Sequence, residues 1–415
     1  MEIPHKAYEV SYLKVISLML KYSPVVDVIT GAMLLYGLSS SGISALYKGF
    51  ILILCIARLC RKTSRRTAIF LLAGAFLSVI ALTGSGEAAA NVSLLYDINL
   101  LIKLFTPIVL ILTYKEMVST SPHQANKETK KVIQFYKVFF PLSIIVPKIL
   151  GIGFSTYSYG AGFKGLYFAG NDISIVMAVV TTWNIDDCIK NMRKKDIALA
   201  GASLLSLLLL GTKTSILMTV LGVMICLLKS KRINATLLVS LFAVLGILLA
   251  VTVFADELQL VLNSFKFFYK KNLYAGRNIV SFLLSQRDVT LKKAFAAAYQ
   301  DNSIRTFLFG NGPYRQVVLS ASDAGLIEMD LFDMFLWFGA PFSIYVCAFY
   351  SSYYRSCRPF ANYLQKFCWL SVIAFSFMAG HVLFTPLANF MLAVLMIDMQ
   401  AKKAEILAEK RTSNG

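Results

Sequence analysis

Apolar runs of roughly 17–20 residues, the length of an α-helix that crosses the hydrocarbon of a bilayer, recur along this 415-residue chain. They are centred near residues 32, 53, 75, 106, 142, 178, 204, 221, 244, 340, 374 and 392. Hydrophobic residues make up 57% of the sequence and charged residues only 15%, too few polar side chains to cover a soluble core. The sequence therefore predicts an all-α integral membrane protein with about twelve transmembrane helices.

The net charge of +19 is spread over short basic clusters between the apolar runs, a pattern of membrane topology rather than of nucleic-acid binding. The clusters are the N-terminal lysines and residues 61–66, 127–131, 190–195, 229–232, 355–366 and 402–411. With the predicted spans, all of these clusters fall on one side of the membrane. The positive-inside rule makes that side the cytoplasm, so both ends of the chain are predicted to be cytoplasmic.

One long polar segment, residues 255–328, separates the ninth run from the tenth and is predicted to form a helical domain on the outer side. Residues 1–254 are expected to hold spans 1–9, residues 329–400 spans 10–12, and residues 401–415 a cytoplasmic tail. None of the seven cysteines lies in the long segment, so the sequence predicts neither a disulfide framework nor a cysteine-rich metal site. No cofactor is expected. Such a domain suits a protein that handles an anionic, membrane-bound substrate.

The loop at 151–171 is rich in glycine and aromatic residues, which let the backbone approach a ligand and offer flat faces to sugars. Its candidate ligand contacts are Tyr157, Lys164, Tyr167 and Asn171. An ordinary glycine-rich surface loop with interfacial tyrosines is the alternative interpretation.

A tight turn at 211–215, Gly-Thr-Lys-Thr-Ser, places Lys213 on the predicted outer side, where turns are usually poor in basic residues. A cation near the membrane is costly unless it faces a polar cavity or an anion. The alternative is a lysine that reaches out to lipid phosphates.

The long segment itself contains several cations, of which Arg277, Arg305 and Arg315 are the candidates for gripping a diphosphate. Most of its other lysines and arginines are expected to be solvated surface charges. Tyr314, beside Arg315, is a further candidate sugar contact.

Glu328 and Asp330 stand at the start of the tenth apolar run, with Asp333 about a turn further along. Carboxylates that enter a bilayer usually line a cavity or pair with a cation, and one of them is a candidate base. Favourable interaction with a helix N-terminus is the alternative. His381, near the same face, is a weaker candidate base, because a lone histidine at a helix end is more often structural.

Several short motifs occur in an order that resembles the O-antigen ligase and polymerase superfamily. The motifs are Gly-Phe-Lys-Gly-Leu-Tyr-Phe-Ala-Gly-Asn at 162–171, Gly-Thr-Lys-Thr-Ser at 211–215, Gly-Arg-Asn at 276–278, Leu-Phe-Gly-Asn-Gly at 308–312, Ile-Glu-Met-Asp-Leu-Phe-Asp at 327–333 and Trp-Phe-Gly-Ala at 337–340. The resemblance implies a helical membrane glycosyltransferase of the bacterial plasma membrane that needs no nucleotide sugar and no metal. Its substrates would be undecaprenyl-diphosphate-linked glycans.

The resemblance also assigns residues. Lys164 matches the cation of the family's glycine-rich loop, Lys213 the arginine after its Thr-x-Ser-like turn, and Arg277 its loop arginine. Ligases of the family carry a histidine just before the acidic helix, where this chain has Ser-Asp-Ala-Gly at 322–325. That departure favours a Wzy-type polysaccharide polymerase over a ligase.

The sequence therefore leads to the hypothesis of an O-antigen or capsule polymerase. In it, Arg277, Lys213 and Lys164 bind the diphosphate, while Glu328, or failing that Asp330 or His381, acts on the acceptor hydroxyl. A chain-length regulator and a flippase would be its partners, beside membrane lipids. The alternatives are a ligase that transfers the finished glycan to another acceptor, and a flippase or other transporter.

Overall fold

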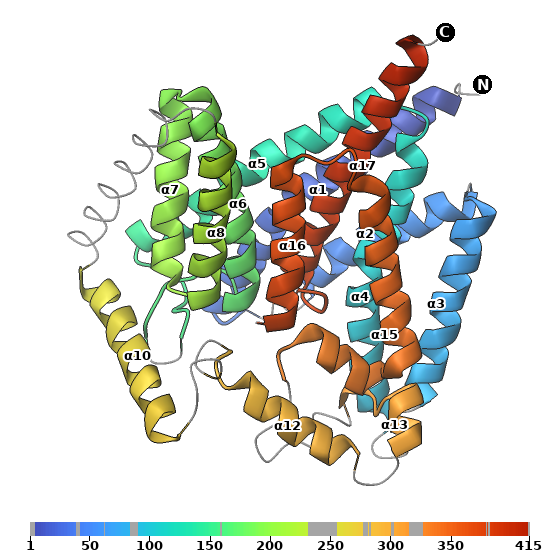
Figure 1. Cartoon of the computed structure of the whole chain (residues 1–415). Helices are drawn as coiled ribbons and strands as arrows, with labels where there is room; N and C mark the ends of the chain where they lie inside the picture. The colour runs from blue at the N-terminus through green and yellow to red at the C-terminus, as the bar shows by residue number, and fades with distance from the viewer. Residues whose placement is uncertain are drawn as a thin grey trace. The chain divides into compact units, whose positions relative to one another are not determined.

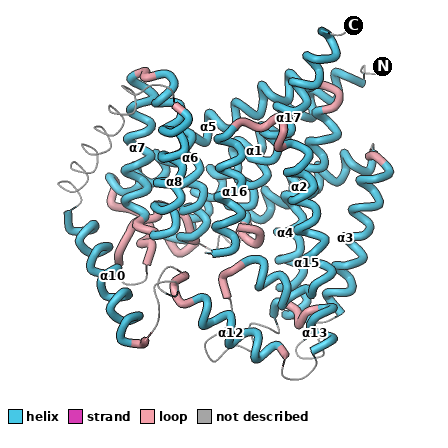
Figure 2. The backbone as a smooth tube through the Cα atoms, viewed as in Figure 1, coloured by secondary structure: helices cyan, strands magenta, loops and turns pink. Residues whose placement is uncertain are grey.

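The computed structural model describes residues 5–38, 42–61, 63–83, 90–157, 160–230, 255–276, 281, 284–299, 303–314, 327–378, 380 and 382–413. Nearly all of this described chain is helical, with short loops between the helices (Figures 1 and 2). Within it, extended pairing is limited to an isolated bridge between Ser155 and Phe163. The all-helical class predicted from the sequence is confirmed.

Among the described residues, six helices are long and apolar enough to cross a membrane. They are α1 (His5–Leu35), α2 (Ile43–Arg61), α3 (Arg65–Thr83), α4 (Ala90–Val118), α5 (Pro122–Ile149) and α15 (Asp330–Cys357). Each overlaps one of the predicted apolar runs, although the apolar part of α1, Glu9–Leu35, lies mostly before residue 32, where the first run is centred. A continuous helix suits such a run because its backbone polar groups are all satisfied within the segment. The chain is therefore a helical membrane protein.

Five other predicted spans coincide with helices that are shorter or more polar. They are α6 (Gly170–Asn191), α7 (Lys194–Leu210), α8 (Lys213–Lys229), α16 (Tyr363–Met378) and α17 (Pro386–Ser413). The helices α7 and α8 have 17 residues each, and α17 continues into a charged second half. The predicted span centred near residue 244 lies outside the described residues.

The chain divides into two compact units, each built from separate stretches of sequence. Unit 1 comprises Met1–Ile51, His123–Arg277 and Asn362–Val372, and unit 2 comprises Leu52–Pro122, Asn278–Ala361 and Ile373–Gly415. The predicted outer segment falls partly in each. Its described helices are α10 (Ala255–Tyr274) in unit 1, and α12 (Arg287–Ala298) and α13 (Ser303–Phe309) in unit 2.

In unit 1, α6 packs against both α7 and α8 (Figure 1). A β-carbon on Gly222 of α8 would lie only 2.5 Å from the Thr182 hydroxyl of α6, so the two helices approach closely there. On the other side of α6, the Asn184 amide donates to the Ser203 hydroxyl of α7 at 2.7 Å. Close approach and buried polar bonds of this kind are typical of helix contacts in membrane proteins.

In unit 2, α17 packs along α4, and α15 packs against α3, α12 and α13. The helix α15 is kinked at Gly339, which has φ +79°, just before Pro341. The α13 end meets this kink: the Gly312 amide donates to the Trp337 carbonyl at 3.0 Å. A β-carbon on Gly310 would lie 2.3 Å from the Trp337 backbone. The sequence motifs at 308–312 and 337–340 are therefore two halves of one backbone contact.

Candidate functional site

The glycine-rich loop and the 211–215 turn, which we call the loop–turn cluster, are in contact within unit 1. The Phe163 amide donates to the Leu209 carbonyl at 2.7 Å, just before that turn. Gly162, with φ +69°, passes so close to the Leu210 carbonyl oxygen that a β-carbon would lie 2.6 Å from it. The Thr212 hydroxyl donates to Ser174 of α6 at 2.8 Å. Glycine at 162 is thus required for loop and turn to meet.

Lys164 is half-buried in this cluster. Its ammonium donates to the Phe168 carbonyl at 2.6 Å and lies 6.0 Å from the centroid of the Phe154 ring. Burial lowers the pKa of Lys164 below the ordinary 10.5, and the nearby Asp172 carboxylate opposes part of that shift. A partly desolvated cation in a glycine-rich loop is able to bind an anion, because less hydration is lost when the anion arrives.

The lowered pKa predicts that the Lys164 amine loses its proton at lower pH than an ordinary lysine. Because only the neutral amine is nucleophilic, competitive amine labelling over a pH series, read by mass spectrometry, should give a Lys164 midpoint below 10.5. The same titration in denaturant is the control and should return the midpoint to its ordinary value. A midpoint at or above 10.5 in the folded protein would contradict the desolvation.

The other predicted residues of the first unit have different surroundings. The Tyr157 hydroxyl, partly exposed, donates to the Gly211 carbonyl at 3.5 Å, and Asn171 is partly exposed in the first turn of α6. Lys213 is the first residue of α8 and is also partly exposed. Tyr167, by contrast, is 3% exposed, and its hydroxyl is hydrogen-bonded to Ser143 at 2.8 Å. Tyr167 therefore packs inside the unit, while the other three remain accessible.

In unit 2, Glu328 forms an ion pair with Arg287, the first residue of α12. The Arg287 side chain is 12% exposed and that of Glu328 40% exposed, so the carboxylate is the more accessible partner. Arg287 also donates to the Met378 carbonyl at 3.3 Å. Its buried Nε has no hydrogen-bond partner among the described residues. We call this arrangement the Arg287–Glu328 pair.

The backbone at Glu328 is in the left-handed region, with φ 60°, which is uncommon for residues other than glycine. Gly380 lies against it: a β-carbon there would be 2.1 Å from the Glu328 carbonyl oxygen. Such conformations persist only where the surrounding structure imposes them, and they are frequent at functional sites. Glu328 lies outside the helix α15, which begins at Asp330 after the extended residue Met329, and its carboxylate pairs with Arg287.

Asp330 and Asp333 are buried, and their carboxylates accept hydrogen bonds from neighbouring parts of the chain. Asp330 is 1% exposed, and one of its carboxylate oxygens accepts three hydrogen bonds, from the Ser376 hydroxyl at 2.6 Å and the amides of Val382 and Leu383 at 2.8 and 2.9 Å. Asp333 accepts from the amides of Ile327 and Met329, at 3.1 and 3.0 Å. These acids fix the two segments that surround Glu328, and only Glu328 among the three is accessible.

Tyr314 and Arg305 also belong to unit 2. The Tyr314 amide donates to the Asp97 carboxylate of α4 at 2.9 Å, and its ring packs edge-on to Tyr96 with the centroids 6.1 Å apart. Arg305 is exposed on the short helix α13. The hydrogen bonds and ion pairs given above for the described residues do not connect either side chain to the Arg287–Glu328 pair.

Arg277, Arg315 and His381 lie outside the described residues, as do residues 322–325, which the predicted resemblance compared with a ligase histidine. Sequence reasoning treated Arg287 as one of several surface cations and did not select it. No local pattern marks it, because its partner Glu328 is 41 residues away. The acidic motif at 327–333 was the available signal, since a carboxylate at a membrane boundary usually has a cation beside it.

Comparison with protein-family models, curated proteins and solved structures found no match. The resemblance of the motifs therefore remains a prediction. A function for this chain is therefore proposed from the geometry of the loop–turn cluster and of the Arg287–Glu328 pair.

Proposed function

We propose that this chain is a polysaccharide polymerase of the bacterial plasma membrane, acting at the outer face. In this proposal it has about twelve transmembrane helices, a long outer segment after the ninth and both termini in the cytoplasm. It transfers a growing glycan from undecaprenyl diphosphate to a sugar hydroxyl of a lipid-linked repeat unit. The observation that carries the proposal is the Arg287–Glu328 pair, which joins a cation for the diphosphate to an accessible carboxylate for the hydroxyl.

The pair suggests how substrate binding prepares the reaction. Without substrate, Glu328 is held in the ion pair with Arg287. The arriving diphosphate offers oxygens that match the guanidinium fork and carries more negative charge than one carboxylate, so it competes for Arg287. Glu328 is then released as a base. The largely buried position of Arg287 strengthens its interaction with the charge that develops on the leaving group.

The proposed transfer needs no cofactor, because the donor lipid supplies the leaving group and Glu328 takes the proton. The acceptor oxygen forms a bond to the anomeric carbon of the donor sugar, and the bond from that carbon to the diphosphate oxygen breaks. Undecaprenyl diphosphate leaves with the electron pair, stabilised by Arg287, and the hydroxyl proton passes to Glu328. A diphosphate is a stable leaving group, so the step requires no general acid, in contrast to glycoside hydrolysis.

Lys164 and Lys213 of the loop–turn cluster stay candidate diphosphate contacts. The half-buried ammonium of Lys164 and the position of Lys213 at a helix start are compatible with an anion. Tyr157 and Asn171 remain accessible candidates for sugar contact in the same cluster.

Deletion of the gene in the source organism tests the assignment. A polymerase mutant should place a single repeat unit on the normal surface acceptor, visible by gel electrophoresis of the surface glycan beside the complemented strain. Long chains left on the lipid carrier would instead indicate a ligase, and an unchanged glycan would remove the proposal.

A transporter is the second candidate, and a buried ion pair favours it. Lys48 of α2 and Asp27 of α1 lie in two helices able to cross a membrane, 2.6 Å apart, with side chains 9% and 13% exposed. Ionised groups inside membrane spans often mark the path of an ion or substrate. In the deletion strain, a flippase would leave repeat units on the cytoplasmic face, which separates it from the polymerase.

A further inference from the structure

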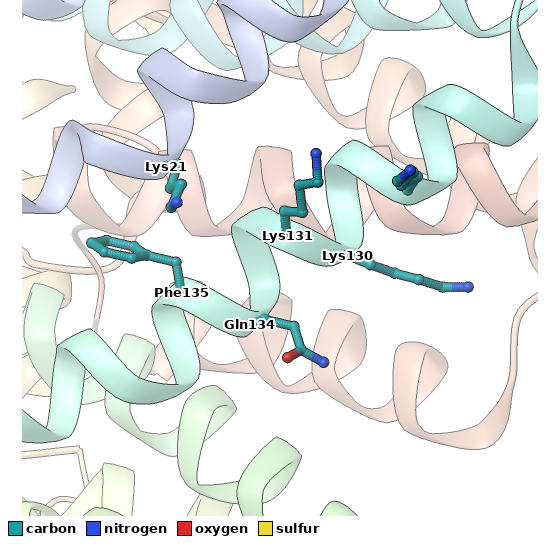
Figure 3. Close-up of a pocket in the computed structure, with 6 residues that line it drawn as sticks. Lys21, Lys130, Lys131, Gln134 and Phe135 are labelled. Carbon is teal, nitrogen blue, oxygen red and sulfur yellow. The ribbon is translucent and has the colours of Figure 1, made fainter.

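A basic pocket in unit 1 is separate from all residues proposed for transfer. It is open to the surface, has a volume of about 510 Å³ and lies between α1 and α5 (Figure 3). Its lining residues are Lys21, Lys127, Lys130, Lys131, Gln134 and Phe135. Four of these six side chains carry a positive charge and none a negative one. We call it the lysine pocket.

The charges of the lysine pocket are only partly compensated by the described residues. Lys131 pairs at 2.8 Å with Glu128, which lies next to the pocket and also accepts from Gln124. The salt bridges found for the described residues include no acidic partner for Lys21, Lys127 or Lys130. Like charges gathered at one concavity repel each other, and an anion bound there would relieve that repulsion.

Lys21 of α1 lies beside aromatic rings in the lysine pocket. Its side chain is partly exposed, and the sequence places it with the other N-terminal lysines on the same side of the membrane as residues 127–131. Its ammonium is 5.1 Å from the ring centroid of Tyr22 and 5.3 Å from that of Phe135. Figure 3 shows Lys21 and Phe135 directed toward each other from the two helices. The rings offer an apolar surface beside the cation, which suits an amphipathic ligand.

The position of the lysine pocket along α5 indicates that the pocket lies at the level of the lipid headgroups. The first ten residues of α5, Pro122–Lys131, are mainly polar, and the stretch from Val132 to Ile149 is mainly apolar. At about 1.5 Å per residue this apolar stretch is roughly 27 Å long, close to the thickness of a bilayer's hydrocarbon. The three lysines of α5 that line the pocket therefore stand at one end of a membrane-length apolar segment, the level at which lipid phosphates are expected.

From these observations we infer that the lysine pocket binds a phosphate group, supplied either by an anionic phospholipid headgroup or by a soluble phosphate ester. The lysines contact the phosphate oxygens, and the Phe135 ring contacts the apolar part of the ligand. Lysines near a membrane surface attract anionic lipid. Several lysines at one pocket therefore favour an anionic lipid over a zwitterionic one.

Native mass spectrometry of the full chain, purified in detergent, tests the inference. The probes are dioleoyl phosphatidylglycerol, zwitterionic dioleoyl phosphatidylcholine and glycerol 3-phosphate. The pocket variant is Lys127→Gln/Lys130→Gln/Lys131→Gln. The matched control, Lys194→Gln/Lys195→Gln/Lys229→Gln, removes three exposed lysines of the same unit that do not line the pocket. Melting temperatures of both variants check that each is folded.

We expect the pocket variant to bind phosphatidylglycerol at least about tenfold more weakly than the native chain, with the control within about twofold. If excess glycerol 3-phosphate releases the lipid from the native chain, the pocket accepts a soluble phosphate ester. If it does not, the lipid headgroup is the ligand. Equal binding by the pocket variant and the native chain, or equal retention of phosphatidylcholine and phosphatidylglycerol, would overturn the inference.

Discussion

Glycan polymerisation should fall by about 100-fold or more when Arg287 is replaced by alanine, because the leaving diphosphate loses a largely desolvated cation. Glu328→Gln should lower it by a similar or larger factor, since a general base typically contributes about 10²–10⁴ to the rate. The side-chain amide introduced by this substitution would still accept a hydrogen bond from Arg287, so the variant should stay folded. The measurement is the length distribution of surface glycan in strains with equal amounts of membrane-inserted protein.

Two controls separate a role in transfer from a role in folding. Lys293→Ala removes an exposed cation of the same helix as Arg287 and should leave chain length unchanged. Arg287→Lys keeps the charge but loses the bidentate fork, so an intermediate activity is expected. Normal chain length in both Arg287→Ala and Glu328→Gln would refute the role of the pair. If every variant that loses activity also has a lowered melting temperature, the Arg287–Glu328 pair stabilises the fold and has no demonstrated role in transfer.

The largest loss of stability is expected for Asp330→Ala. One oxygen of this buried carboxylate accepts hydrogen bonds from Ser376, Val382 and Leu383, so its removal leaves three donors without an acceptor. A buried donor without a partner costs about 1–3 kcal/mol, and the variant should therefore lose at least about 3 kcal/mol of unfolding free energy. Thermal or denaturant unfolding of the purified protein in detergent provides the measurement.

Smaller changes at the same network should give graded effects. Ser376→Ala removes one of the three donors and should cost about 1 kcal/mol. Asp330→Asn keeps an oxygen at the shared position and should be milder than alanine. An Asp330→Ala protein within about 0.5 kcal/mol of the native one would show that the network contributes little.

Much of the helical framework was predictable because it is local. The runs near residues 32, 53, 75, 106, 142 and 340 became helices α1 to α5 and α15, all able to cross a membrane. Within lipid, such a run has to satisfy its own backbone hydrogen bonds, and a helix does so without help from the rest of the chain. The predicted number of spans and the sidedness of the loops stay predictions.

The candidate site was predictable only in part. The acidic motif at 327–333 and the glycine-rich loop at 151–171 were found from residue types alone, and both lie in polar clusters. The sequence did not single out Arg287, nor did it distinguish the accessible Glu328 from the buried Asp330. Tyr167, chosen as a sugar contact for its aromatic ring, is buried, which the sequence did not predict.

By itself, then, the sequence determined that this is a helical membrane protein and where its chemically distinctive residues stand along the chain. The tertiary structure alone decided which of them meet. Arg287 reaches Glu328 across 41 residues, and Asp330 binds groups 46 to 53 residues away. The reason is physical: a helix forms from interactions within about four residues, whereas these pairs depend on how separate helices pack.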